Sequence, residues 1–395
     1  MKRCWLITRN ALFIFDEIHA YEPARLALII TAIGWLHQHY AARFLIMTAT
    51  LPPMVRQALR TALPGCAEIF AADETFEKSR RHEVHLLEGD ILANLDLPLR
   101  DWQSGQSVLV CCNTVSRAQQ AYIELKSRIK SLGLDPHEDI LLLHGRFNGK
   151  DRGDKERRLA ERVGVGAVSR QPTIIVATQV VEVSLNIDLD TIYTDPAPLE
   201  ALLQRFGRVN RGRQTQMLCP VYVFRDPLGA KESLPYNDQI VQASIEVLTR
   251  YCAGKPIDEA LVTQMLAEMY QGEIEAAWQE KFRRHCLEFQ QVLDGMIPFT
   301  SAAWELEKKF YDLFDGWQVL PLACYDEYEQ SIMRYDYLGA SQYLVNISAN
   351  QFGMLSGKGL LRAQEEGQYF RQAAVPYDPE FGLDLNNRLG KDEAP

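Results

Sequence analysis

Short apolar runs alternate with segments of helical periodicity in the first part of the chain. The runs ALFIF (11–15) and FLIM (44–47) flank a segment that begins at Pro23 and keeps apolar residues at helical spacing as far as Tyr40. Such runs are typical of buried strands, and proline is favoured in the first turn of a helix. A strand, a helix and a second strand in this order indicate a parallel sheet covered by helices. The sequence therefore predicts an α/β fold.

The same alternation is more complete between about residues 76 and 230. Five apolar runs there predict strands: SVLVCC (107–112), ILLLH (140–144), TIIVAT (173–178), TIYT (191–194) and PVYVF (220–224). Helical patterns lie at 116–131 and 199–207, and Asn113-Thr114 is placed to cap the first of them. The charged segment 146–169 is predicted to be a loop or an exposed helix.

The character of the sequence changes at about residue 231. From there to residue 395 the pattern is helical and rich in aromatic residues such as Trp278, Phe282 and Phe289. Aromatic residues at helical spacing usually belong to a core, and stacking on the bases of single-stranded nucleic acid is the alternative. The sequence thus divides into three zones: 1–75, 76–230 and 231–395.

The charge balance restricts the possible partners. The 395 residues include 42 Lys and Arg against 52 Asp and Glu, a formal net charge of −10. A protein that coats nucleic acid through charge alone is normally basic, so any nucleic-acid contact here should be a local groove on an acidic body.

The cysteines and the apolar stretches indicate the compartment. Eight cysteines are scattered and none forms a C-x-x-C pair, which argues against a zinc site and against a disulfide framework. A reducing cytoplasm is the expected location. The longest apolar stretch, 26–36, is too short to span a bilayer, so no membrane contact is expected.

Two carboxylates follow the first predicted strand directly. Asp16 and Glu17 belong to the string DEIH, which ends at His19. Ligands of an open parallel sheet bind outside the carboxyl ends of its strands, where this pair could hold Mg²⁺ and orient an attacking water. The alternative is an acidic loop after a strand.

Two threonines follow the second predicted strand at the same sheet edge. Thr48 and Thr50 could hydrogen-bond to the acidic motif. Alternatively, one of them caps the helix that the Pro52-Pro53 pair opens, and on the local pattern alone this is the simpler interpretation.

An arginine-rich motif, QRFGRVNR (204–211), ends a helical pattern. Arg205, Arg208 and Arg211 follow one another at intervals of three, which predicts one helical face. Guanidinium groups stay protonated and suit a triphosphate whose charge grows in the transition state. A solvated basic face is the alternative, although Gly207 costs about 1 kcal/mol in a plain surface helix.

The segment TQVVEVSLNID (178–188) follows the predicted strand TIIVA. Gln179, Glu182 and Ser184 are expected near the loop at the strand edge. A simple alternating strand with a turn at Asn186 is the alternative.

The order of these motifs is more specific than any one of them. DExH, TAT, a strand followed by NT, H-x-R-F, TQxxExSxxID and QRxGRxxR occur in sequence over about 200 residues. Together they resemble the motor core of superfamily 2 helicases. More narrowly, DEIHAYEP (16–23), LLHGRFNGKDR (142–152) and the segment 177–211 resemble the CRISPR-associated helicase-nuclease of type I interference systems. VPYDPEFGLDL (375–385) is similar to a tail segment of that family.

This resemblance implies a domain arrangement. Residues 1–75 would be part of a first RecA-like parallel-sheet domain with motifs II and III. Residues 76–230 would form a complete second RecA-like domain with motifs IV to VI, and residues 231–395 a mainly helical linker and C-terminal region. It also implies ATP and Mg²⁺ as cofactors, and single-stranded DNA and the CRISPR surveillance complex with its guide RNA as partners.

The resemblance further implies roles for single residues. Asp16 would coordinate Mg²⁺ through water, Glu17 would orient and deprotonate the hydrolytic water, and His19 would couple the acidic motif to the second domain. Thr48 and Thr50 would link hydrolysis to strand movement. Contacts to the DNA backbone or the nucleotide edge would come from four residues: Thr178, Gln179, Ser184 and Asp188. The γ-phosphate would be faced by Gln204, Arg208 and Arg211, with one arginine as the finger. His144, Arg146 and Asp151 would be part of the surface of the second domain, without an assigned role.

Three features depart from the family pattern. No GxxxxGK[ST] loop precedes Asp16, none of the eight histidines is followed by the aspartate of the nuclease dipeptide, and Asn186 stands where the family usually has aspartate. The chain is therefore expected to be a truncated or split form that lacks the nuclease, with another chain supplying the phosphate-loop half, and to be inactive as an ATP hydrolase alone.

Two main hypotheses about function follow, with a weaker third. The chain is the motor part of an ATP-dependent single-stranded DNA translocase or helicase in antiviral type I CRISPR interference. Alternatively, it is a non-catalytic module that binds DNA or the surveillance complex. A general repair helicase of superfamily 2 is the third possibility.

Overall fold

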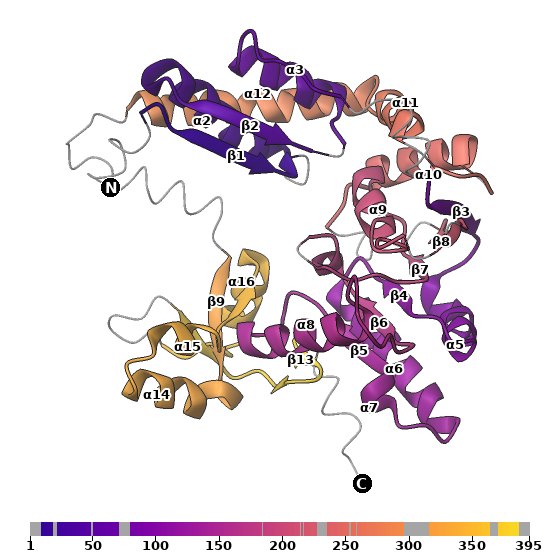
Figure 1. The fold of residues 1–395 in the computed structure, drawn as a ribbon. Helices are drawn as coiled ribbons and strands as arrows, with labels where there is room; N and C mark the ends of the chain where they lie inside the picture. Colours follow the sequence, from indigo (N-terminus) through magenta and orange to yellow (C-terminus); the bar gives the residue numbers. More distant parts are fainter. Residues whose placement is uncertain are drawn as a thin grey trace. The chain divides into compact units, whose positions relative to one another are not determined.

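The computed structural model describes residues 9–18, 22–48, 50–70, 80–183, 185–213, 215, 217–226, 235–252, 254–257, 259–295, 316–363 and 370–386 (Figure 1). Contacts divide the chain into two compact units. Unit 1 comprises Met1–Arg80, Gln242–Tyr251 and Ile257–Asp315, and unit 2 comprises Arg81–Val241, Cys252–Pro256 and Gly316–Pro395.

Unit 1 contains a two-stranded parallel sheet of β1 (Leu12–Asp16) and β2 (Arg43–Met47). The helix α2 (Pro23–Tyr40) connects the strands, and α3 (Pro53–Ala62) follows β2. Both helices begin with proline, whose missing N–H would have no partner in the first turn anyway. The predicted strand–helix–strand–helix order is confirmed.

The two faces of this sheet differ in their surroundings. Phe15, Phe44 and Ile46 pack against the buried residues of α2 and α3. The opposite face is exposed, with Leu12 at 56%, Ile14 at 61%, Leu45 at 46% and Met47 at 43% of their full accessibility. The expectation of fully buried strands was wrong, because the described part of unit 1 covers only one face of this sheet.

Unit 1 also includes helices from the C-terminal part of the chain. The long helix α12 (Glu273–Asp294) packs along α2, as Figure 1 shows. Trp278 and Phe282 stack with ring centroids 4.8 Å apart and pack on the core beneath α2 and α3. Phe289 packs with Leu28 and Leu293. The interpretation as core is confirmed for these three aromatics, of which Phe289 is buried and Trp278 and Phe282 are half-buried. It was wrong for Trp317, which is 48% exposed, and the other aromatics that the same expectation covers lie outside the described residues: Trp304, Phe310, Tyr311 and Phe314.

Two further helices, α10 (Asp238–Cys252) and α11 (Glu259–Met269), precede α12 in the chain. Among the described residues, no helix is long and apolar enough to cross a membrane.

Unit 2 is built on a six-stranded, all-parallel sheet. Its strands are β3 (His82–Leu87), β4 (Val108–Cys111), β5 (Ile140–Leu143), β6 (Ile174–Ala177), β7 (Thr191–Thr194) and β8 (Cys219–Phe224). They lie in the order β3-β8-β7-β4-β6-β5. The five predicted strands are confirmed. The sixth, β3, was missed because HEVHLL places polar residues among its apolar ones, as its position at the sheet edge permits.

Helices connect the strands of unit 2. They include α5 (Asp96–Gln103), α6 (Val115–Ser131), α8 (Gly149–Val163) and α9 (Leu199–Phe206), with short helical segments η2 (Ile91–Asn94), α7 (Pro136–Asp139) and η3 (Gln179–Val181). Thr114 caps α6 as predicted, because its side chain accepts a hydrogen bond from the N–H of Arg117 at 3.3 Å. The charged segment after residue 146 is the helix α8, capped by Asn148.

The last part of unit 2 adds a small sheet that the sequence analysis did not predict. Three short strands lie in the order β10-β9-β11: β9 (Trp317–Pro321), β10 (Val345–Ile347) and β11 (Arg371–Ala373). Short helices accompany them: η4 (Leu322–Cys324), α14 (Tyr325–Met333), α15 (Tyr337–Ser341) and α16 (Ala349–Gly357). A turn between β12 (Tyr377–Asp378) and β13 (Gly382–Leu383) ends the described chain.

Candidate functional site

The predicted acidic motif lies at the carboxyl end of β1. Asp16 is the last residue of that strand and pairs in register with Met47, the last residue of β2. The N–H of Glu17 donates to the carbonyl of Met47 at 3.0 Å. Glu17 has φ of 54°, a left-handed conformation that is rare for a side chain of this kind and that clusters at functional sites. His19 lies outside the described residues.

The two predicted threonines lie at the same edge. Thr48 follows β2 directly, and its hydroxyl donates to the carbonyl of Thr50 at 2.7 Å. The interpretation as a helix cap was wrong, since α3 begins after Pro52 without a side-chain cap. The hydroxyl of Thr50 is buried and has no hydrogen-bond partner in the described part of the chain. It is therefore available to a group bound at this edge.

The residues at this edge fit a magnesium ion held jointly with a substrate. The carboxylate of Asp16 is exposed at the strand end, and Mg²⁺ commonly takes one or two protein carboxylates together with water and phosphate oxygens. Within the described ranges, no group of three or more His, Cys, Asp or Glu side chains could hold a metal by itself. The remaining ligands would have to come from water and a phosphate-bearing ligand.

In unit 2, the loops after β4 and β6 meet at the carboxyl edge of the large sheet. Thr178 follows β6 and is 2% exposed, and its backbone N–H donates a hydrogen bond to the carbonyl of Leu143 at 3.2 Å. Gln179 donates its side-chain amide to the carbonyl of Asn113, just past β4, at 2.6 Å. Ser184 lies outside the described residues.

Asp188 connects the segment 178–188 to the arginine-rich motif. It is 1% exposed, and its Oδ1 accepts a hydrogen bond from the backbone N–H of Arg211 at 2.8 Å. Arg170 lies on the other side of this carboxylate, with Nη1 3.9 Å from Oδ2. A Cβ atom on Gly212 would lie 2.8 Å from Asp188 Oδ2, so a larger residue here would force the carboxylate or the turn to move.

The three arginines of the motif do not share a helical face, and that expectation was wrong. The helix α9 ends at Phe206 with Gly207 as its C-cap, so Arg208 and Arg211 lie in the following turn. Gln204 remains on α9 and is half-buried.

Arg208 and Arg211 both turn to one loop of their own unit. Arg208 is 6% exposed and donates from Nη2 to the carbonyl of Glu182 at 2.6 Å and from Nη1 to the carbonyl of Leu185. Arg211 donates from Nη1 to the same Leu185 carbonyl at 3.0 Å. Arg211 is exposed, and it is the arginine of this pair that solvent reaches.

Arg205 is fully buried and belongs to the interior of unit 2. Its guanidinium donates to Glu182 Oε1 at 2.9 Å, Thr194 Oγ1 at 2.6 Å, Asn113 Oδ1 at 3.2 Å and the Tyr236 hydroxyl at 3.1 Å. Burial alone would lower the pKa of Arg205, but the groups around it, Cys111, Tyr236 and Glu182, raise it well above its ordinary value. This arginine holds the strand ends together and is not placed to contact a ligand.

A second buried ion pair lies at the same edge and was missed. Arg117 on α6 bridges Asp195 after β7, at 2.9 Å, and Asp90, at 2.7 Å. Burial would lower the pKa of Arg117, yet its hydrogen bonds to the two carboxylates raise it. The predicted strands and the arginine-rich motif indicate in the sequence where this edge of the sheet lies. No local sequence pattern predicts that Arg117, Asp195 or Tyr236 would lie there.

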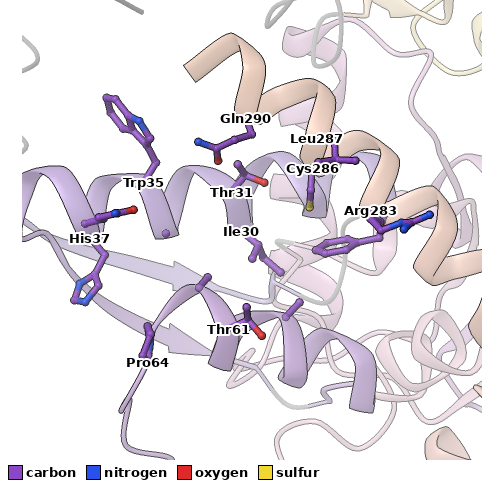
Figure 2. A pocket seen from close by; sticks show the side chains of 15 residues that line it. Ile30, Thr31, Trp35, His37, Thr61, Pro64, Arg283, Cys286, Leu287 and Gln290 are labelled. Atoms are coloured by element: carbon purple, nitrogen blue, oxygen red, sulfur yellow. The ribbon is translucent and has the colours of Figure 1, made fainter. Parts of the chain in front are cut away.

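A cavity of about 910 Å³ lies within unit 1, between α2, α3 and α12 (Figure 2). Ile30, Trp35 and His37 of α2 line it together with Arg283 and Cys286 of α12. None of the predicted site residues lines this cavity, so it is distinct from the edge that carries Asp16 and Thr48.

The comparisons with known proteins agree with the motif order. Residues 104–214 match the family model described as "CRISPR-associated nuclease/helicase Cas3, C-terminal". The chain is a homologue of the Cas3 proteins. The Cas3 of Escherichia coli K12 is 40% identical over 229 residues, which cover 51% of this chain and 25% of that protein. The Cas3 of Methanothermobacter thermautotrophicus is 28% identical over 328 residues, covering 78% of this chain and 37% of that protein.

The fold agrees with solved Cas3 structures. The crystal structure of T. fusca Cas3 superposes with a TM-score of 0.71 at 16% identity, and covers 98% of this chain and 57% of that one. The α/β fold on parallel sheets is therefore that of the Cas3 proteins. The chain spans between a quarter and a half of the length of the curated Cas3 relatives it matches.

Proposed function

We propose that this chain is the motor part of an ATP-dependent single-stranded DNA translocase or helicase in type I CRISPR interference, and so acts in antiviral defence. The observation that carries the proposal is the hydrogen bond between Asp188 and the N–H of Arg211. It joins the two most specific motifs of unit 2, and so fixes the turn that carries Arg211 to the segment that leaves the carboxyl end of β6, the end of a parallel strand where ligands of such sheets bind. Homology to the Cas3 helicase-nucleases supports a CRISPR-associated helicase role.

The proposed roles follow the strand edges. Asp16, Glu17, Thr48 and Thr50 would serve the nucleotide from residues 1–75, a partial first RecA-like domain. A second RecA-like domain, residues 76–230, would contribute Thr178, Gln179, Ser184 and Asp188 at the DNA or nucleotide edge. The γ-phosphate would be faced by Gln204, Arg208 and Arg211. His19 would couple the two domains, and residues 231–395 would be accessory.

Mg²⁺ bound with ATP would neutralise phosphate charge as the terminal phosphoryl group departs. Asp16 would hold the ion through its exposed carboxylate, and Glu17 would accept a proton from the attacking water. Of Arg208 and Arg211, Arg211 would be the better placed to stabilise the growing negative charge. Its side chain is exposed, while its backbone N–H is fixed by the hydrogen bond to Asp188.

The phosphate loop would come from another polypeptide segment. The exposed apolar face of β1 and β2 supports this, since parallel sheets are normally covered on both faces. We propose that the segment carrying the phosphate loop covers Leu12, Ile14, Leu45 and Met47, and that the chain alone hydrolyses ATP too slowly to measure.

The proposed partners are single-stranded DNA and the CRISPR surveillance complex with its guide RNA. A solved structure titled "CRISPR RNA-guided surveillance complex, pre-nicking" contains a chain with the same fold, at a TM-score of 0.65 and 18% identity. In such systems base pairing supplies the sequence specificity, and the motor needs only the DNA backbone.

Binding of labelled single-stranded DNA, measured with and without a non-hydrolysable ATP analogue, tests the proposal. We expect the analogue to change DNA affinity once a phosphate-loop segment is supplied, and Glu17→Gln to abolish ATP turnover without preventing that change. DNA binding that never responds to nucleotide would favour the alternative, a non-catalytic module that binds DNA or the surveillance complex.

A further inference from the structure

The H-x-R-F motif (144–147) has no role in the proposed motor, yet it lies at one of the most densely bonded places of unit 2. His144 follows β5 and is fully buried, so the expectation of a surface position was wrong for this residue. Its ring stacks on Phe147 with ring centroids 4.4 Å apart. The segment that packs against His144 and Arg146 comprises residues 376–384, and we name it the latch segment. It runs from Pro376 to Asp384 and contains β12 and β13.

Both ring nitrogens of His144 are in use. Nδ1 accepts the backbone N–H of Arg146 at 3.1 Å, so the ring proton is on Nε2, which donates to the carbonyl of Phe381 at 3.0 Å. Gln119 donates to the same carbonyl at 3.3 Å. Burial, with Arg146 nearby, lowers the pKa of His144 to about 3, so the ring stays neutral. While the latch segment is docked, His144 has no atom left for a nucleic acid or nucleotide.

The latch segment adds a large apolar anchor and a charged one. Phe381 is 3% exposed and belongs to the main core of unit 2. The Glu380 carboxylate accepts hydrogen bonds from Tyr122 and Lys126, and its carbonyl accepts one from Lys155 at 3.0 Å.

Backbone and tyrosine contacts fix the register of the latch segment. The N–H of Leu383 donates to the carbonyl of Arg146 at 3.0 Å. The Tyr377 hydroxyl donates to Asp151 Oδ2 at 2.6 Å and accepts from the N–H of Asn148 at 3.2 Å. The loop between β5 and α8 and the first turn of α8 thus bind the same segment, through His144, Arg146, Asn148 and Asp151.

Gly382 makes the approach possible. It has φ of +78°, and a Cβ atom there would lie 2.6 Å from Cε1 of His144 and 3.1 Å from the carbonyl of Arg146. No other residue type fits this position without displacing the segment.

We propose that residues 144–155 form a peptide-binding site for an acidic–aromatic turn, and that its ligand is the chain's own latch segment. Since the latch segment follows β11 within a few residues, this site fastens the small sheet of β9, β10 and β11 to the large parallel sheet. The H-x-R-F motif is then a docking motif and not a contact for nucleic acid.

Hydrogen exchange of the full chain, read by mass spectrometry of peptides that cover 376–386, tests this site. Gly382→Ala is the disrupting variant. Gly133→Ala is its matched control, because Gly133 has φ of +77° with nothing within 4 Å of the added Cβ. We expect exchange in the latch segment to become at least ten-fold faster in Gly382→Ala and to stay unchanged in Gly133→Ala.

A second variant keeps the test valid if Gly382→Ala does not fold. Glu380→Ala removes only the partly exposed carboxylate that Tyr122 and Lys126 hold, and should speed exchange of the same peptide two- to five-fold. Unchanged exchange in both variants would overturn the proposal. So would a rise of ten-fold or more in single-stranded DNA affinity in Gly382→Ala that Arg146→Ala removes, because the latch segment would then be covering a nucleic-acid site.

Discussion

The backbone N–H of Arg211 donates a hydrogen bond to Oδ1 of Asp188 at 2.8 Å. The carboxylate is almost fully buried, and the bond fixes the backbone at Arg211, whose side chain is exposed to solvent. A buried carboxylate that accepts backbone N–H groups holds its loop in one conformation, because breaking the bond would leave an unpaired charge. The position of an exposed arginine is thus set by a residue 23 places earlier in the sequence.

Gly212→Ala should disturb this bond directly. The new Cβ would lie 2.8 Å from Asp188 Oδ2, so we expect a loss of about 1–3 kcal/mol in the free energy of unfolding, the usual cost of overpacking. Urea denaturation measures it. Gly353→Ala is the control, since an added Cβ there meets nothing within 4 Å. Equal stability of the two variants would show that the approach of Gly212 to Asp188 is not constrained.

Arg205→Ala should destabilise unit 2 strongly. The substitution leaves Glu182 without its buried cation and removes the donors to Thr194 and Asn113, and breaking a buried pair in this way costs about 3–5 kcal/mol. Tyr236→Phe, which removes one hydroxyl from the same group, should cost only about 1 kcal/mol. Thermal or urea unfolding followed by circular dichroism would show the difference, with Arg157→Ala as an exposed control. A small effect of Arg205→Ala would mean that Arg205 is not the centre of this network.

The stability of the chain should fall as the pH is lowered from about 6.5 to about 4. His82 and His144 are buried and neutral, and burial lowers their pKa values to about 4 and about 3. In the unfolded chain they titrate near 6.5, so between these values the unfolded state binds more protons and is favoured. Above pH 6.5 this contribution is fully present.

Urea unfolding at pH 7, 6 and 5 measures that slope. His82→Gln, which removes one of the two groups, should reduce it, whereas the exposed His39→Gln should not. A slope that His82→Gln leaves intact would contradict the assignment.

The exposed face of β1 and β2 should tolerate polar residues in the isolated chain. Ile14 is 61% exposed, so Ile14→Ser removes little buried area and should change the free energy of unfolding by less than about 1 kcal/mol. The packed neighbour Phe15→Ser should cost much more. If a phosphate-loop segment binds this face, Ile14→Ser should weaken its association at least ten-fold in a pull-down or calorimetric titration. Unchanged association would place that segment elsewhere.

Arg208→Lys in a reconstituted complex should lower ATP turnover far more than DNA affinity. Lysine keeps the charge but cannot reach both the Glu182 and Leu185 carbonyls, which the planar guanidinium contacts together. Steady-state ATPase and fluorescence anisotropy report the two quantities. Parallel losses in both would assign Arg208 to DNA binding and not to the γ-phosphate.

The local elements and their order follow from short-range patterns in the amino-acid sequence. Apolar runs such as TIIVAT and TIYT became strands, and Pro23 to Tyr40 became a helix, because spacing and proline chemistry act over a few residues. For the same reason Asp16 and Thr48 could be placed at one sheet edge, since parallel neighbours end together.

Which of these residues contact one another depends on how the chain folds in three dimensions. The intervals in QRFGRVNR suggested one helical face, but Gly207 ends the helix, and Arg205 turns inward to Glu182 and Tyr236. The packing of α12 on α2 and the docking of Phe381 beside His144 join segments more than two hundred residues apart in the chain. Such contacts depend on complementary shape and on the pairing of buried polar groups across the fold, and neither leaves a periodic trace in the sequence.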